Sequence, residues 1–188
     1  MELSEILLKR RSYRSLSKIE INEEIINKLA EAASMSPSCY NNQPWRYIFV
    51  FEDEMLNRMF SALSEGNAWA KEASMIIAVL SNKEYDCKMP DGRVYFQFDT
   101  GMATVLMMLK ATELGLVAHP IAGFIPEKVK EILQIPDEIE VITLLIVGKN
   151  ADKLNPILKD YQIESERKRP ERKAVSEFAF LNQFSDKK

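Results

Sequence analysis

The sequence predicts a single domain of the α+β class. Segments with apolar residues at helical spacing alternate with short runs that are rich in β-branched and aromatic residues. The chain has 188 residues, which is enough to bury one large core without cross-links. No segment approaches the ~20 consecutive apolar residues of a membrane span, and the first residues lack the apolar core of a signal peptide. We therefore expect a soluble protein with no membrane partner.

The first half of the chain alternates between helices and strands. Residues 2–9 have apolar side chains at helical spacing, and Asn22 is a suitable N-cap for a helix that continues to Ala33. Two prolines and several small polar residues predict a loop over residues 36–44. The remaining elements of this half are a strand at residues 46–51, a helix at 53–63 and a largely buried strand at 74–80.

The second half is built around one long helix. Residues 94–114 are apolar on most of the helical circumference, which is typical of a helix with neighbours on several sides, and Gly115 would end it. Irregular structure is predicted at residues 119–124, then a helix at 126–133 and a strand at 140–147. We expect residues 1–150 to form the core and residues 151–188 to form a C-terminal extension of the same domain.

Composition limits the partners and the compartment. The balance of 25 basic and 28 acidic residues excludes a surface built as a whole for nucleic acid, so any anion site must be local. Cys39 and Cys87 are the only cysteines, which predicts no disulfide framework and a reducing compartment, the cytoplasm. His119 is the only histidine, which excludes a histidine-rich metal site. We expect no bound metal.

Residues 10–14 form a basic segment that is suited to a phosphate group. Arg10, Arg11 and Arg14 supply charged, fork-shaped donors, and Ser12 adds a short neutral one. The alternative is a solvated basic turn that binds nothing, and the segment alone does not decide between the two.

The loop at residues 37–45 is a second candidate site. Its small residues and amides offer groups that can read a flat heteroaromatic ring with mixed donors and acceptors. The alternative is an ordinary connection between a helix and a strand, with Trp45 in the core. The candidate residues are Pro37, Ser38, Cys39, Asn41 and Gln43.

Both segments match motifs of one enzyme family. Residues 10–14 fit the pattern R-x-S-x-R/K, and residues 37–45 fit P-S-x-x-N-x-Q-P-W. Together with residues 120–124 and the basic residues 167–169, they resemble the nitroreductase family of FMN-dependent NAD(P)H oxidoreductases over nearly the whole chain. The resemblance implies a nitroreductase-like fold, in which helices surround a central mixed β-sheet and the C-terminal extension packs on the partner subunit of a homodimer.

The resemblance also assigns roles to particular residues. It implies that the basic segment holds the FMN phosphate and reaches the pyrimidine edge, that Asn41 reads the flavin, and that the loop around Cys39 approaches the ring from the partner subunit. The backbone N–H of Ala122 would face flavin N5, although many members have an acidic residue at this position. The residues carried over are Arg10, Arg11, Ser12, Arg14, Pro37, Ser38, Cys39, Asn41, Gln43, Ile121, Ala122 and Gly123, with Lys168 or Arg169 as a further phosphate ligand.

The implied activity is a two-electron reduction with ping-pong kinetics. NADH or NADPH would donate the electrons, and a nitroaromatic, a quinone or a similar electron-poor small molecule would accept them. We expect no side chain to act as a catalytic acid or base, because the cofactor supplies the chemistry. Two alternatives stay open: a protein that stores or senses flavin, and a specialised member of the fold that dehalogenates, oxidises azolines or cleaves flavin.

Overall fold

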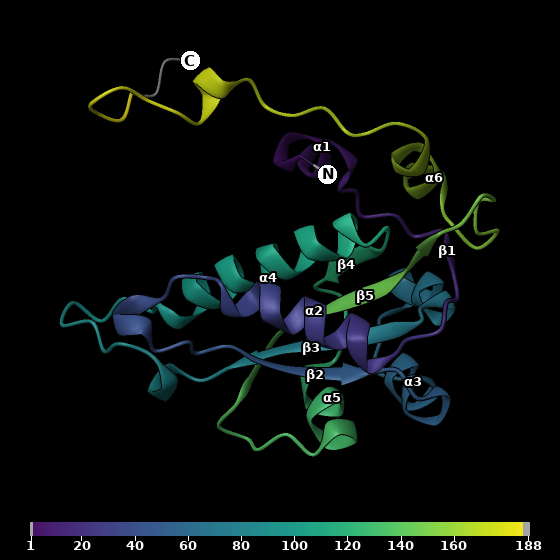
Figure 1. The fold of residues 1–188 in the computed structure, drawn as a ribbon, viewed down its shortest axis with the longest axis horizontal. Coiled ribbons are helices and arrows are strands. Elements are labelled where there is room, and N and C mark those ends of the chain that lie inside the picture. Colours follow the sequence, from purple (N-terminus) through teal and green to yellow (C-terminus); the bar gives the residue numbers. More distant parts are fainter. Residues whose placement is uncertain (1, 186–188) are drawn as a thin grey trace.

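The computed structural model describes residues 2–185 and confirms the α+β class (Figure 1). None of the helices in these residues has the length and apolar character needed to cross a membrane. The helices are α1 (Leu3–Lys9), α2 (Glu23–Ser34), α3 (Asp53–Phe60), α4 (Phe96–Glu113), α5 (Pro126–Leu133) and α6 (Asp160–Arg167). The strands are β1 (Leu16–Ser17), β2 (Arg46–Val50), β3 (Met75–Ser81), β4 (Val117–Ile121) and β5 (Glu140–Asn150).

The strands form one antiparallel sheet. β3 lies between β2 and β5, and β4 pairs with the middle of β5, while the two residues of β1 pair with its last residues. Every strand pair within residues 2–185 is antiparallel, so the mixed pairing that we expected is not observed. The apolar pattern of a strand predicts its existence but carries no signal of its direction relative to a neighbour.

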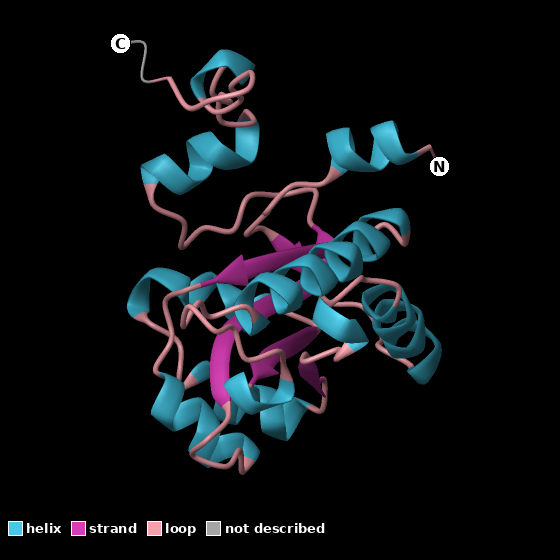
Figure 2. Ribbon diagram, turned by 90° about the vertical axis from the view of Figure 1, so that its left-hand side faces the viewer, coloured by secondary structure: helices cyan, strands magenta, loops and turns pink. Residues whose placement is uncertain are grey.

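The two central strands are buried on both faces. All seven residues of β3 are buried, and the six from Met75 to Leu80 alternate between two apolar clusters, as the twofold period of a strand requires. Ile76 and Ala78 belong to one cluster, whereas Met75 and Ile77 belong to the other. Figure 2 shows the consequence, with helices on both sides of the sheet. The continuous apolar runs at residues 75–80 and 144–147 therefore indicate strand segments that are covered on both faces.

Each face of the sheet has its own group of helices. α2 and α4 cover one face and contribute Leu29 and Met107 to its cluster. α3, α5 and a 3-10 helix at Glu65–Glu72 cover the other face, where Trp69 is almost fully buried. Gly115 ends the α4 region with a φ of 77°, a left-handed conformation that favours glycine.

The region 119–124 differs from the sequence expectation. His119 and Pro120 lie inside β4, where an irregular segment was expected. Pro120 fits because β4 pairs with β5 alone and is an edge strand, the place in a sheet where a missing N–H is tolerated. β5 also continues to Asn150, three residues beyond its predicted end at 147, because β1 pairs with its last residues.

The cap of α2 provides a test of this local reading. The Asn22 side chain accepts a hydrogen bond from the backbone N–H of Ile25 at 3.0 Å. Asn22→Ala should lower the free energy of unfolding by about 1 kcal/mol, because it leaves a helix N–H without its acceptor. Urea denaturation measures the change, and Asn22→Asp is the matched control, since it keeps the acceptor. Equal losses in both variants would contradict the capping role.

Candidate functional site

Glu166 holds the arginine segment in place. Residues 10–14 connect α1 to β1 and run past α6, which contains Glu166. The buried Glu166 carboxylate accepts hydrogen bonds from the backbone N–H groups of Arg14 at 2.8 Å and Ser15 at 3.1 Å. Hydrogen bonds to a charged acceptor are stronger than neutral ones. The C-terminal part of the chain therefore fixes the backbone of the basic segment.

Arg11 has a structural role in the same contact. Its guanidinium donates to the backbone carbonyl oxygens of Ser165 and Glu166 and lies 4.6 Å from the ring centre of Tyr13. These contacts orient the Arg11 side chain toward α6 and strengthen the attachment of the basic segment to that helix. Of the three arginines in the segment, Arg10 and Arg14 are thus the better candidates for an anion.

Guanidinium groups from two parts of the chain line a small cavity beside this segment. Its volume is about 160 Å³. Burial lowers the pKa of Arg10, and the positive charges of Arg169 and Arg172 lower it further. Such crowding of like charges is relieved by an anion. The lining residues include Arg10, Arg11, Ser12, Arg14, Arg169 and Arg172, which we call the arginine pocket.

The two candidates for a further phosphate ligand differ in position. Arg169 lines the arginine pocket and donates to the backbone carbonyl oxygens of Leu8 and Arg10, the latter at 2.7 Å. Lys168 has an exposed side chain and lies 3.9 Å from the Glu171 carboxylate. The structure therefore brings Arg169, and not Lys168, into the arginine pocket.

His119 lies behind the arginine segment in a buried position. Its Nδ1 is 3.1 Å from the backbone carbonyl oxygen of Tyr13, and its ring is 4.7 Å from the ring of Trp69. Burial lowers the pKa of His119 to about 4, and the charges of Arg14 and Arg10 act in the same direction. The imidazole is therefore neutral near pH 7 and packs as a structural group.

The residues Ile121, Ala122 and Gly123 lie at the end of β4, the strand that also contains His119, and just after it. Ile121 is buried in the sheet, whereas Ala122 is exposed. A Cβ atom added to Gly123 would lie 2.4 Å from Ser64 Oγ, closer than real Cβ contacts allow. Gly123 thus packs closely against the side chains of the loop after α3, which would have to move for any larger residue. The chain leaves the strand with Ala122 at the surface.

The second candidate segment has an unusual backbone. Tyr40, Asn41 and Gln43 have φ values of 49°, 58° and 50°, which are uncommon for residues other than glycine. Ser38 Oγ accepts a hydrogen bond from the backbone N–H of Gln43 at 2.9 Å and closes the loop. Asn41 and Gln43 are exposed. Strained, exposed loops of this kind are typical of functional sites.

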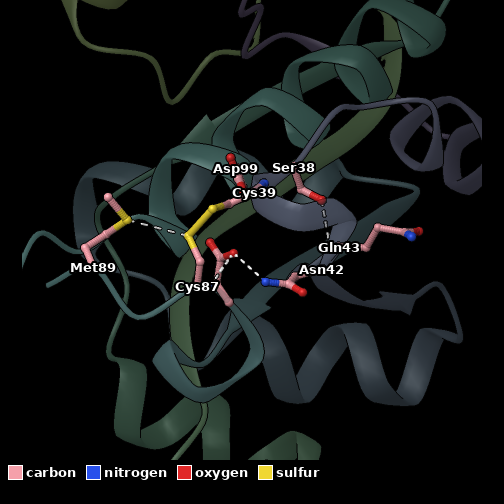
Figure 3. The surroundings of a disulfide bond; sticks show 8 residues. Ser38, Cys39, Asn42, Gln43, Cys87, Met89 and Asp99 are labelled. Atoms are coloured by element: carbon pink, nitrogen blue, oxygen red, sulfur yellow. Dashed lines mark hydrogen bonds between the residues drawn. A yellow bond between two sulfur atoms is a disulfide. The ribbon is translucent and has the colours of Figure 1, made fainter.

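Cys39 in this loop forms a disulfide with Cys87, a cross-link that the low cysteine count, which predicted no disulfide framework, did not lead us to expect (Figure 3). The two cysteines are 48 residues apart in the sequence, and their Cα atoms are 6.1 Å apart. The segment after β3, which contains Cys87, folds back on the loop. Asp99 of α4 also contacts the loop, because its Oδ2 accepts a hydrogen bond from the backbone N–H of Cys39 at 2.7 Å. Spacing along the chain does not reveal such a tertiary contact.

The structure does not bring all the predicted site residues together within one chain. In Figure 1 the loop around Cys39 lies at the left end of the molecule, whereas the arginine segment lies near β1 and α6 at the right end. Helix α4 runs between these two regions. The fold and the arginine pocket thus define the class: an α+β protein with a cationic pocket at one end of an antiparallel sheet and a strained polar loop at the other.

Comparison with known proteins identifies the family. The model of the nitroreductase family matches residues 7–149. This region includes both motifs, the strands β1 to β4, all but the last residue of β5, and the helices α2 to α5. The chain belongs to the nitroreductase family, and the resemblance seen in the sequence is confirmed.

Similar proteins of known structure support the same fold over almost the whole chain. A structure described as an oxidoreductase containing FMN is 30% identical, with a TM-score of 0.83, and the match covers 96% of this chain and 91% of that one. A nitroreductase family protein from Clostridium difficile 630 is 29% identical, with a TM-score of 0.79 and coverage of 98% and 100%. A relative from Archaeoglobus fulgidus with the provisional name NADH dehydrogenase/NAD(P)H nitroreductase is 29% identical over 91% of this chain and 95% of its own.

Sequence reasoning missed two residues of the arginine pocket region. Glu166 and Arg172 lie in the charged run at residues 164–173, which reads as solvated surface. Only the fold shows that Glu166 is buried and that Arg172 faces Arg10. Neither residue can be distinguished in the sequence, because most of the residues around them are also charged. Nothing in the local pattern separates the buried Glu166, or the Arg172 of the pocket, from exposed neighbours.

The buried histidine predicts a specific dependence of stability on pH. The pKa of His119 is about 4 in the folded chain, below its ordinary value of 6.5, so the unfolded chain takes up this proton at higher pH. The contribution of the neutral His119 to the free energy of unfolding is therefore fully present above about pH 6.5, and it is lost as the pH falls toward 4. Between pH 7 and pH 5 the loss from this group should be about 2 kcal/mol.

Urea denaturation at several pH values measures this effect. His119→Gln should reduce the fall in stability between pH 7 and pH 5 by that amount, because glutamine does not titrate. Identical pH profiles for the wild type and the variant would show that His119 is protonated in the folded state as easily as in the unfolded state.

Proposed function

We propose that the chain is a cytoplasmic, FMN-dependent NAD(P)H oxidoreductase that works as a homodimer. The observation that carries this proposal is the arginine pocket, where several guanidinium groups converge on a cavity of about 160 Å³. Pockets for drug-sized ligands usually have about 300–1,000 Å³. The cavity therefore suits an anionic group such as a phosphate and not a whole cofactor.

The residues of this pocket fit the phosphate of FMN. Arg10 and Arg14 would donate charge-assisted hydrogen bonds to it, Ser12 would add a neutral donor, and Arg172 would contribute positive charge. Arg11 and Arg169 already donate to backbone carbonyl oxygens, so they would act mainly by holding the pocket and by their charge. The cation of Arg14 would also stabilise negative charge on the pyrimidine edge of a flavin.

The ring of the flavin would lie between two subunits. In one chain, Ala122 and Gly123 follow His119, which contacts the arginine segment, but the loop around Cys39 and Asn41 is at the far end of α4. A second chain, related by a twofold axis, could supply this loop. The separation of the two candidate segments within one chain is the observation that supports a composite site.

The exposed apolar residues support a homodimer. α1 exposes Leu8, α4 exposes Phe98 and Val105, and the C-terminal segment exposes Phe178 and Leu181, the last with 91% of its surface accessible. Figure 1 shows this segment leaving α6 and running past α1, away from the sheet. α1 and α4 are in contact, and exposed apolar side chains that gather on adjacent elements are typical of an interface. The extension at residues 151–188 would thus pack on the partner subunit.

Bound FMN would supply the two-electron chemistry between NADH or NADPH and an electron-poor acceptor, such as a nitroaromatic or a quinone. The protein would bind, orient and stabilise, and it needs no catalytic acid or base. The neutral state of His119 at pH 7 agrees with this role. The names of two relatives, which mention FMN, NADH and NAD(P)H, support the same assignment.

The phosphate assignment can be tested with two ligands. Arg10→Ala or Arg14→Ala should weaken FMN binding about 10- to 150-fold, because one hydrogen bond to a charged group contributes about 1.5–3 kcal/mol. Oxidised riboflavin lacks the phosphate and carries no negative charge on its ring, so it should bind to the wild type and the variants almost equally. Isothermal titration calorimetry measures both ligands, and the exposed Lys168 provides a control variant, Lys168→Ala, with little effect expected. Equal losses for FMN and riboflavin would refute the phosphate role.

The dimer can be tested without touching the arginine pocket. Truncation after Lys173 keeps Glu166, Arg169 and Arg172 but removes the exposed apolar residues of the C-terminal segment. Multi-angle light scattering should show a dimer that dissociates at higher concentration than the full chain, with FMN lost in parallel. Truncation after Ser185 is the matched control and should behave like the full chain. A truncated monomer that holds FMN normally would contradict the composite site.

A further inference from the structure

The disulfide lies beside a carboxylate, in a group of side chains whose sulfur and oxygen atoms are of the types that ligate metals. One ligand atom each from Cys39, Asp86 and Cys87 lies within 4.8 Å of the other two. The thioether of Met89 is also close, with its sulfur 3.8 Å from Cys87 Sγ (Figure 3). Two sulfur atoms and a carboxylate oxygen are a donor set that suits a thiophilic divalent cation.

Two buried carboxylates beside the sulfurs lack a cationic partner. Asp86 and Asp99 are 7% and 0% exposed, and one oxygen of each, Asp86 Oδ2 and Asp99 Oδ1, has no hydrogen-bond partner. No salt bridge within residues 2–185 reaches either group. Unpaired buried carboxylate oxygens are costly, so a positive charge at this position would be stabilising.

The other oxygens of these carboxylates are already held in position. Asp86 Oδ1 accepts from the backbone N–H of Cys87 at 2.7 Å and from Asn42 Nδ2 at 3.4 Å. Asp99 Oδ2 accepts from the backbone N–H of Cys39. The hydrogen bonds orient both side chains and both cysteines before any ion binds, as supporting contacts do in metal sites. Asp86 thus has one oxygen fixed by the protein and one oxygen left for a ligand.

We propose that, when Cys39 and Cys87 are reduced, the chain binds one thiophilic divalent cation of the Zn²⁺ type through these two sulfurs and Asp86. A water molecule would complete the tetrahedral set. In the oxidised chain the disulfide occupies the same place, so the cross-link and the metal exclude each other. This site is separate from the arginine pocket, and its existence does not depend on the proposed flavin chemistry.

The conversion between the two states is balanced by an external thiol. Two thiols of a reductant such as glutathione give up two electrons and two protons, become a disulfide, and leave Cys39 and Cys87 as thiols. The cation then displaces the two thiol protons into solution. A reducing compartment such as the cytoplasm favours the thiol form, and the metal would then restore the link between the loop at residues 36–44 and the segment after β3.

Zinc binding by the reduced, full-length protein tests the proposal. The protein is reduced with dithiothreitol, desalted without oxygen, and titrated with ZnCl₂ by calorimetry in buffers of different ionisation enthalpy. We expect one Zn²⁺ per chain with proton release, no such binding by the oxidised protein, and loss of binding in Cys39→Ser and Cys87→Ser. Asp86→Asn should weaken binding at least about 10-fold, the scale on which metal sites respond to altered surroundings.

Asp91→Asn is the matched control, because Asp91 lies in the same segment but is exposed and pairs with Arg93. It should bind Zn²⁺ like the wild type. Near-ultraviolet circular dichroism checks that each variant is folded. Zinc-edge X-ray absorption should report two sulfur ligands at about 2.3 Å.

Two results would overturn the proposal. In the first, the reduced wild type binds Zn²⁺ no better than the Cys39→Ser/Cys87→Ser double variant, and the unpaired oxygens of Asp86 and Asp99 then share a proton instead. In the second, Zn²⁺ binds with oxygen and nitrogen ligands only. Neither result would affect the proposed function, which the FMN and riboflavin titrations test separately.

Discussion

The antiparallel pairing of β3 with β5 is the constraint on which the rest of the structure depends. The two strands pair from Met75 with Val147 to Ser81 with Glu140, and both are covered by helices on each face. Because β5 is central, it also pairs with β4 and, at its far end, with β1. A one-residue shift of register would turn the side chains of β5 to the opposite face of the sheet and would displace the strands that pair with it.

The β-sheet also determines where the guanidinium groups of the arginine pocket lie. The pairing of Leu16 with Asn150 brings the start of the chain beside the end of the sheet, and Glu166 then holds the backbone at Arg14. The chain as a whole carries a net charge of -3, so the concentration of guanidinium groups is local and has a structural cause. A carboxylate that binds backbone N–H groups holds this cluster together without neutralising the guanidinium groups, which leaves their charge available to a ligand.

Local patterns in the sequence predicted the elements well, and tertiary relationships poorly. The Asn22 cap, the apolar strand over β3 and the long helix α4 follow from spacing and residue type, and the structure contains all three. The two family motifs led to the correct family, which the match over residues 7–149 confirms. Pro120 suggested irregular structure because a proline does not reveal whether its strand is at an edge. Glu166 and the Cys39–Cys87 pair depend on contacts between distant segments, which no local pattern encodes.

The attachment of Arg14 to Glu166 has a consequence for the synthesis of the chain. The two residues are 152 positions apart, so nearly the whole chain must emerge before the contact can form. At a synthesis rate of about 5–20 residues per second, the basic segment waits roughly 8–30 s for its partner. Contacts of such sequence separation also form late in folding, since a long loop must close first. The arginine pocket is therefore one of the last parts of the molecule to be completed. A chain whose synthesis stops before residue 166 can fold its sheet at most, and it lacks the hydrogen bonds from Glu166 that hold the basic segment.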